Sequence, residues 1–216
     1  THASTRTDRS MPTHSVTDQS LNDPLYLEAI AAFREKHART PELGVREPSA
    51  VSLATVDANG QPSIRTVLLR GFDERGFVFF TNSQSRKGTQ MAVNPLVALT
   101  FYWDAWAEQV HVEGRVELIP DTESDEYWKT RARLSQIGAW ASLQSRPMPA
   151  REDFLAAVTE IEKRFEKKDV PRPRHWFGYR VVPNRIEFWS GREGRLHERH
   201  VYESEGEAWT KHMLYP

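Results

Sequence analysis

The spacing of hydrophobic residues changes from a helical to a strand-like pattern near residue 50. After Asp23 and Pro24, the apolar positions are spaced for one face of a helix: Leu27, Ile30, Ala31 and Phe33. Asp23 is a suitable N-cap, Pro24 suits the first helical turn, and the pattern ends near Arg39. From Ala50 onward, most segments alternate with the period of a β-strand. We therefore expect one helix followed by a β-rich body.

The predicted strands are short and follow one another closely. Residues 49–57 and 62–72 flank Ala58-Asn59-Gly60, a turn sequence that supplies positive φ and favours a β-hairpin. The other predicted strands cover residues 77–81, 97–103, 108–119, 176–182, 185–190, 195–203 and 208–214. Because few helices separate these strands, the pattern predicts an α+β fold built on an antiparallel barrel.

Four further helices are predicted between the strands, at residues 86–93, 122–133, 137–143 and 151–168. Ser85 is a suitable N-cap for the first of them. Thr122 and Asp125 have the spacing of a capping box that opens the second. The last helix carries its apolar residues on one face: Phe154, Leu155, Val158, Ile161 and Phe165.

Composition narrows the class of protein. The 216 residues include 29 Lys+Arg and 30 Asp+Glu, and this net charge of −1 disfavours a bulk electrostatic nucleic-acid binder. The absence of cysteine excludes disulfides, thiolate catalysis and cysteine-ligated metal sites. The sequence has neither an apolar run that could span a membrane nor a signal peptide, so we expect a soluble cytoplasmic protein. Polar residues 1–20 are expected to form a mobile arm, and residues 21–216 a single domain.

Two groups of polar residues near predicted helices are candidates for binding an anion. Ser85, Arg86 and Lys87 would place a hydroxyl and two cations at a helix start, where unpaired N–H groups favour phosphate. An ordinary capped helix is the alternative interpretation. Tyr127, Arg131 and Ser135 would share one face if their helix continues past residue 133, and they are typical phosphate or carboxylate ligands. A solvated helix face explains this spacing equally well.

A third group alternates along a predicted strand and consists of Arg195, His197 and Arg199. These side chains would repel one another unless an anion or a neighbouring carboxylate compensates; a charged edge strand is the alternative. Arg65 and Arg70 are five residues apart, which places them on opposite faces of a regular strand. Nucleophile-elbow, zinc-protease, Walker and dinucleotide motifs are all absent. The remaining pattern favours a phosphorylated planar ligand.

Three segments resemble the pyridoxine/pyridoxamine 5′-phosphate oxidases: RTVLLRGFDERGFVFFTNSQSRKG, SQIGAWASLQS and IEFWSGREGRLHER. The resemblance extends in consistent order from about Leu21 to Pro216. It implies an FMN-binding split β-barrel with flanking helices, assembled as a homodimer with flavin at the subunit interface. It also implies FMN-dependent oxidation of pyridoxine or pyridoxamine 5′-phosphate to pyridoxal 5′-phosphate, with O2 as acceptor and H2O2 as product.

The resemblance implies a role for each matching position. The residues expected to hold FMN are Arg65, Thr66, Val67, Leu68, Phe80, Thr81, Ser85, Arg86, Lys87, Gln109, Gln144, Ser145, Trp189 and Arg199. The residues expected to bind the substrate phosphate are Arg70, Tyr127, Arg131 and Ser135, with Arg70 standing where the family usually has Lys. Arg195 and His197 are expected to hold the pyridine ring and to act in catalysis. No metal, nucleic acid or membrane partner is implied.

Three alternative functions use the same features. A related split-barrel flavin oxidase could act on another reduced ring, such as a phenazine precursor, but such a substrate has no need of a phosphate-binding triad. A flavin or pyridoxal-phosphate carrier would bind flavin that substrate cannot reduce. A small-barrel nucleic-acid binder would use the Arg and Trp residues, and the net charge of −1 disfavours it.

Overall fold

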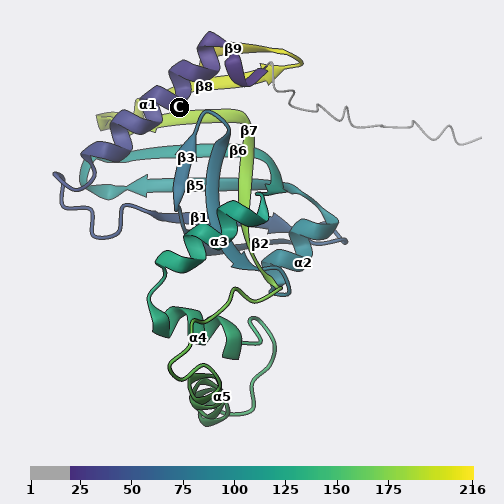
Figure 1. Ribbon diagram of the computed structural model, residues 1–216. Helices are drawn as coiled ribbons and strands as arrows, with labels where there is room; N and C mark the ends of the chain where they lie inside the picture. Colours follow the sequence, from purple (N-terminus) through teal and green to yellow (C-terminus); the bar gives the residue numbers. More distant parts are fainter. Residues whose placement is uncertain (1–19) are drawn as a thin grey trace, which may run out of the picture.

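A computed structural model of the chain describes residues 20–216, so the predicted arm lies outside the described residues except for Ser20. Within them, nine antiparallel strands form one curled sheet: β1 Ala50–Val56, β2 Pro62–Leu68, β3 Gly71–Asp73, β4 Gly76–Asn82, β5 Leu96–Trp103, β6 Glu108–Leu118, β7 Trp176–Ser190, β8 Glu198–Glu205 and β9 Ala208–Leu214. The five α-helices are α1 Pro24–Arg39, α2 Arg86–Val93, α3 Asp121–Thr130, α4 Arg133–Ala141 and α5 Arg151–Arg164. The predicted α+β fold on antiparallel strands is confirmed (Figure 1).

The strand order explains the barrel-like curl. The sheet runs β2-β1-β5-β6-β7-β4-β3, and β2 at one end also lies against β4 near the other end. Strands β8 and β9 branch from β7, and Figure 1 shows them beside α1 at the end of the barrel farthest from α4 and α5. Strand β7 is therefore central, because it pairs with β4, β6 and β8 at different points along its length.

The prediction of two separate strands at residues 176–182 and 185–190 is wrong, because both segments belong to β7. It is one strand of 15 residues, and the break expected at Pro183 and Asn184 is a bulge. Gly114 of β6 pairs with Pro183 and the preceding Glu113 pairs with Arg185, which leaves Asn184 as the extra residue. A bulge tolerates Pro183, which has no N–H for the ladder. A Cβ on Gly114 would lie 2.2 Å from the carbonyl oxygen of Val182, so the close approach requires glycine.

The main core lies between α1 and the inner face of the sheet. Phe33 is fully buried, and its ring packs edge-on against Phe72 and Phe77 at 4.8 and 4.9 Å between centroids. The start of α1 follows the sequence pattern, because the Asp23 carboxylate accepts a hydrogen bond from the N–H of Leu25 at 2.8 Å. A second, smaller core joins α3 and α4 to the start of β7, around Trp128, Ile137 and Trp176.

Several predicted helix boundaries are wrong. Helix α3 begins after Pro120 without a side-chain cap, so the predicted capping box at Thr122 and Asp125 does not form. It ends at Thr130, the next two residues are extended with ψ of 141° and 138°, and α4 starts at Arg133. Helix α5 ends at Arg164 rather than residue 168. Its predicted apolar face is only partly used, because Leu155 is exposed.

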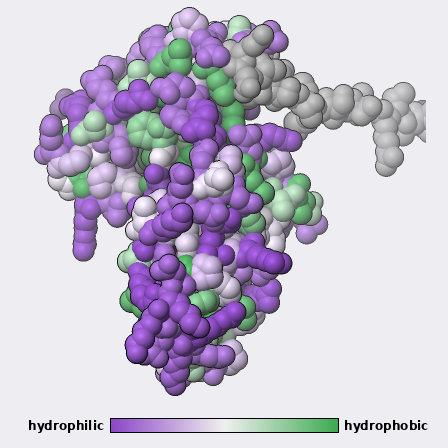
Figure 2. Space-filling view, in the orientation of Figure 1, coloured by the Kyte–Doolittle hydropathy of each residue, from purple (hydrophilic) through white to green (hydrophobic). Residues whose placement is uncertain are grey.

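The two ends of the molecule differ in the hydropathy of their surfaces. Figure 2 shows mostly hydrophilic side chains over the end formed by α4 and α5, and larger hydrophobic patches nearer α1. Among residues 20–216, no helix is both long and apolar enough to cross a membrane.

Candidate functional site

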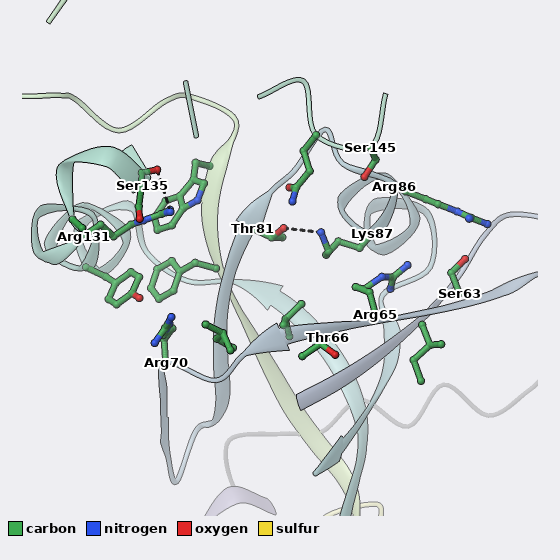
Figure 3. A pocket seen from close by; sticks show the side chains of 18 of the residues that line it. Ser63, Arg65, Thr66, Arg70, Thr81, Arg86, Lys87, Arg131, Ser135 and Ser145 are labelled. Atoms are coloured by element: carbon green, nitrogen blue, oxygen red, sulfur yellow. Dashed lines mark hydrogen bonds between the residues drawn. The ribbon is translucent and has the colours of Figure 1, made fainter. Parts of the chain in front are cut away.

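One cavity of about 790 Å³ opens between β2, the end of β4, the start of α2 and the α3–α4 joint. Most of the residues expected to bind FMN line it: Arg65, Thr66, Val67, Leu68, Phe80, Thr81, Arg86, Lys87, Gln144 and Ser145. The four residues expected to bind the substrate phosphate also line it: Arg70, Tyr127, Arg131 and Ser135. Segments far apart in the sequence therefore meet in one pocket, as Figure 3 shows.

The start of α2 builds one cationic side of the cavity. Ser85 has the predicted N-cap role, since its Oγ accepts a hydrogen bond from the N–H of Gly88 at 3.3 Å. Ser85 is fully buried and does not line the cavity itself, but its cap directs Arg86 and Lys87 there. The Lys87 ammonium donates to Thr81 Oγ1 at 3.2 Å, and burial together with the nearby Arg65 lowers the pKa of Lys87.

Arg65 reaches the same side from β2. Its guanidinium donates to the carbonyl oxygen of Leu53 at 3.2 Å, to Thr55 Oγ1 at 2.6 Å and to Gln90 Oε1 at 3.4 Å. Burial, and then the positive charge of Arg86, lower the pKa of Arg65. Thr55 and Gln90 were not singled out by the sequence analysis, because a threonine in a strand and a glutamine in a helix carry no local functional signal.

The α3–α4 joint builds the opposite side. Tyr127, Arg131 and Ser135 were expected to share one helix face only if their helix continued past residue 133, and that condition is not met. The joint achieves the same result, because Arg131 lies in the extended link and its Nη2 donates to the backbone oxygen of Ser135 at 3.3 Å. The Arg131 guanidinium also lies over the ring of Trp176, 4.7 Å from the centroid. Burial lowers the pKa of Arg131, and the positive charge of Arg70 acts in the same direction.

Aromatic rings connect the two sides. The ring of Phe80 stacks on Tyr127 at 4.1 Å between centroids and on Trp176 at 5.0 Å, with interplanar angles of 16° and 11°. Phe80 is on β4, directly before Thr81, and both residues line the cavity. The cavity therefore has an apolar wall between two polar groups, which suits a planar ligand with anionic ends.

The cavity is strongly electropositive. Five basic side chains line it: Arg65, Arg70, Arg86, Lys87 and Arg131. None of them lies within ion-pair distance of a carboxylate of residues 20–216. In Figure 3, Arg131 and Arg70 lie on one side and Arg65, Lys87 and Arg86 on the other. Uncompensated cations at two separated points favour a ligand, or a pair of ligands, with two anionic groups.

The remaining expected site residues form a second group away from this cavity. Gln109, Trp189 and Arg199 are cross-strand neighbours on β6, β7 and β8. The His197 ring packs on Trp189 at 4.6 Å between centroids, and Trp189 is only half-buried. Arg195 is exposed nearby. None of these five residues lines the cavity within one chain.

The local structure of the second group differs from the prediction in one respect. Arg195 ends a 3-10 turn, Glu193–Arg195, with φ of 61°, and β8 begins only at Glu198. Arg195, His197 and Arg199 therefore do not alternate along one strand. The carboxylate needed to compensate Arg199 is Glu187, whose Oε1 accepts from Arg199 Nε at 2.7 Å. The His197 ring accepts a hydrogen bond at Nδ1 from the N–H of Arg192 at 3.2 Å, and the exposed Arg195 guanidinium makes no ion pair with a carboxylate of residues 20–216.

The described residues show no metal centre. No three His, Asp or Glu side chains of residues 20–216 are placed to hold a metal ion.

Comparison with known proteins identifies the family. Residues 40–165 match the family model for pyridoxamine 5′-phosphate oxidase, and residues 176–216 match that for the pyridoxine 5′-phosphate oxidase C-terminal dimerisation region. The pyridoxine/pyridoxamine 5′-phosphate oxidase of Myxococcus xanthus strain DK1622 is 52% identical over 189 residues, which cover 88% of this chain and 92% of that protein.

Solved structures agree with this match. PhzG from Burkholderia lata 383, in complex with tetrahydrophenazine-1-carboxylic acid, superposes with a TM-score of 0.83 at 31% identity, covering 89% of this chain and 96% of that one. A pyridoxamine 5′-phosphate oxidase-related, FMN binding protein from Nostoc punctiforme has a TM-score of 0.69 at 18% identity, covering 86% of this chain and 96% of that one, and supports the fold. The chain is thus an oxidoreductase and belongs to the pyridoxine/pyridoxamine 5′-phosphate oxidase family.

Proposed function

We propose that the protein oxidises pyridoxine 5′-phosphate or pyridoxamine 5′-phosphate to pyridoxal 5′-phosphate, with FMN as cofactor, O2 as electron acceptor and H2O2 as product. The observation that carries this proposal is the cavity with two separate groups of unpaired cations on either side of an aromatic wall. Two phosphorylated planar molecules, a flavin and a pyridine, match that arrangement. The name shared by the relatives that are about half identical to this chain supports the same reaction.

The side of the cavity formed by β2 and the start of α2 has the residues needed to bind FMN. Arg65, Arg86 and Lys87 would hold its phosphate, which carries close to two negative charges and accepts hydrogen bonds from all of them. The β2 segment Arg65–Leu68 and Thr81 line the adjoining part of the cavity and would hold the ring. When bound, FMN supplies the two-electron redox chemistry that no amino-acid side chain provides.

The substrate would occupy the α3–α4 side. Arg131, with Tyr127 and Ser135, would bind its phosphate, and Arg70 adds a further positive charge. A phosphate held on the α3–α4 side, opposite the residues that would hold FMN, would orient the carbon that is oxidised, which is the 4′ carbon of the pyridine. The desolvated guanidinium of Arg131 interacts more strongly with phosphate than an exposed one would.

The group around Trp189 would complete the site from a second subunit. We propose a homodimer, which is supported by the dimerisation-region match at residues 176–216 and by the position of this group outside the cavity. Gln109, Trp189 and Arg199 would then contact the flavin. Arg195 and His197 would orient the pyridine ring and stabilise negative charge that develops on its 3-oxygen.

The direct test is formation of pyridoxal 5′-phosphate from pyridoxine 5′-phosphate by FMN-saturated protein in air. We expect one H2O2 for each pyridoxal 5′-phosphate, and no turnover beyond one equivalent per flavin when O2 is removed. Tight FMN binding without turnover would contradict the proposed substrate. The same outcome would leave the fold assignment intact.

A phenazine-type reduced ring is the second candidate substrate, because PhzG superposes closely on this chain. The variant Arg131→Ala separates the two. If the substrate is phosphorylated, the loss of Arg131 should raise KM much more than it lowers kcat, since it removes binding common to the ground and transition states. The variant Lys129→Ala, which removes an exposed cation that does not line the cavity, is the control. Turnover of a dihydrophenazine carboxylate with no effect of Arg131→Ala would favour the alternative.

A further inference from the structure

We propose that Thr55 and Gln90 are positioning residues that hold the Arg65 guanidinium ready for the FMN phosphate without neutralising its charge. This inference rests on the proposed function, because it takes the phosphate of FMN as the anion that Arg65 binds. Neither residue lines the cavity, so each acts only through Arg65.

The three residues come from three different elements. Arg65 is on β2 and Thr55 on the paired strand β1, whose residue Leu53 lies directly opposite Arg65. Gln90 reaches them from α2, which packs against β1. Thr55 is completely buried, and Gln90 retains 5% of its exposure. A buried polar side chain with specific partners indicates a fixed arrangement rather than a solvated surface.

The hydrogen bonds have a defined direction. The Thr55 hydroxyl donates to Gln90 Oε1 at 2.6 Å, which leaves the hydroxyl lone pairs to accept from Arg65 Nη1 at 2.6 Å. Gln90 Oε1 also accepts from Arg65 Nη2 at 3.4 Å, and its Nε2 donates to Ser63 Oγ at 3.1 Å. Because both ends of the Gln90 amide have partners, the oxygen is held facing Thr55 and Arg65. The guanidinium is thus fixed by two of its nitrogens before any ligand arrives.

The neutrality of these acceptors is the informative feature. Arg180 is buried and is paired with the carboxylates of Asp73 and Glu123 at 3.0 and 3.3 Å, whereas Arg65 is half-buried. Arg65 is fixed instead by a carbonyl oxygen, a hydroxyl and an amide. A carboxylate at position 90 would fix the guanidinium equally well, but it would compete with the phosphate for the same charge. Gln90 therefore orients Arg65 and leaves its positive charge available.

Four variants test this assignment. Thr55→Val removes the hydroxyl at nearly constant volume, and Thr55→Ser restores it. Gln90→Glu keeps the shape and adds a carboxylate beside Arg65. Gln84→Glu makes the same substitution at an exposed residue just before α2 and serves as the matched control. The dissociation constants of FMN and of riboflavin, which lacks the phosphate, are measured for each variant by quenching of flavin fluorescence.

We expect Thr55→Val to weaken FMN binding by about tenfold, as for loss of a hydrogen bond to a charged group, and riboflavin binding by less than about twofold. Thr55→Ser should restore the preference for FMN. Gln90→Glu should reduce the preference by at least about tenfold, and Gln84→Glu by much less. The loss in Gln90→Glu should diminish as the pH falls and the new carboxylate is protonated.

The outcomes separate this inference from the proposed function. A wild-type protein with no preference for FMN over riboflavin would contradict the proposed cofactor itself. A wild-type preference that survives in Gln90→Glu, or a loss that is equal for both flavins, would overturn the positioning role alone. If Thr55→Val does not fold, the comparison of Gln90→Glu with Gln84→Glu decides the question.

Discussion

Lys87 is a buried lysine at the cavity. Its side chain is largely buried, its ammonium donates to the hydroxyl groups of Thr81 and Ser85, and the positive charge of Arg65 acts on it. No carboxylate of residues 20–216 pairs with it. A cation in such a place costs stability unless an anion arrives, which is what a binding site for phosphate requires.

The pH dependence of FMN binding should reveal this cation. Because burial and Arg65 lower the pKa of Lys87 from 10.5, its positive charge is lost at a lower pH than in the unfolded chain. FMN affinity should therefore decrease as the pH rises through a window that begins below 10.5. In Lys87→Met, affinity should be low and should lack this decrease. The dissociation constant of FMN measured against pH for both proteins checks this, and parallel curves would contradict it.

The same lowered pKa predicts the opposite trend for the protein without FMN. Below its folded-state pKa, charged Lys87 destabilises the fold; between that pKa and 10.5 only the unfolded chain keeps the proton, so this cost disappears as the pH rises. The difference in melting temperature between wild type and Lys87→Met should shift in favour of wild type across this window. The two opposite trends distinguish a binding cation from a merely structural one.

At the scale of elements, the turn that precedes α2 depends on Gly88. A Cβ at this position would lie 2.3 Å from the backbone oxygen of Ser83, and backbone atoms cannot move aside as a flexible side chain can. Gly88 also supplies the N–H that Ser85 caps. The approach of residue 83 to the helix is therefore what places Arg86 and Lys87 at the cavity.

We expect Gly88→Ala to destabilise the protein by about 1–3 kcal/mol and to weaken FMN binding, because the start of α2 must shift to relieve the overlap. Gly138→Ala is the matched control, since a Cβ there meets no atom within 4 Å and alanine is the better helix former. Chemical denaturation and FMN titration of both variants provide the measurement. Equal stability of the two variants would contradict this prediction, because it would show that the backbone at Ser83 can move away from a Cβ at position 88 at little energetic cost.

Elements with local signals were predictable from the sequence, and elements set by distant contacts were not. The caps at Asp23 and Ser85 depend on residues within three positions, and both are confirmed. The break between α3 and α4 has neither glycine nor proline to mark it. It is stabilised by Trp176, which lies over Arg131, and by Gln136, whose Nε2 donates to the backbone oxygen of Trp128 at 2.9 Å.

The same distinction applies to the candidate site. On a regular strand Arg65 and Arg70 would lie on opposite faces, and they could serve one ligand only if one of them lay at a strand end or if they bound different groups. Both line the cavity, because β2 ends at Leu68 and Arg70 lies beyond it. The resemblance to the family identified most of the residues that line the cavity. The sequence did not indicate which residues hold the Arg65 guanidinium in place. Thr55 and Gln90 acquire that role only when β1, β2 and α2 pack together.

At the scale of the whole molecule, one chain carries two groups of expected site residues that do not meet. The cavity lies among β2, α2 and the α3–α4 joint. Arg195, His197 and Arg199 instead lie at or just before β8, within the segment 176–216 that matches a dimerisation region. Figure 1 shows β8 beside α1 at one end of the barrel and α4 at the other. If the site is complete only in a dimer, each of its two copies takes the cavity from one subunit and the Arg195 group from the other.

Mixed dimers test this division directly. We expect Arg195→Ala alone to reduce turnover more than FMN occupancy, and Arg131→Ala alone to have little activity at low substrate concentration. In a heterodimer with one variant in each subunit, purified through two different tags, one site carries both changes and the other carries neither. About half of the wild-type activity should therefore return if the two groups come from different subunits. If both groups served the same subunit's site, every site would carry one change and activity would remain low, which would place the second group in a different role.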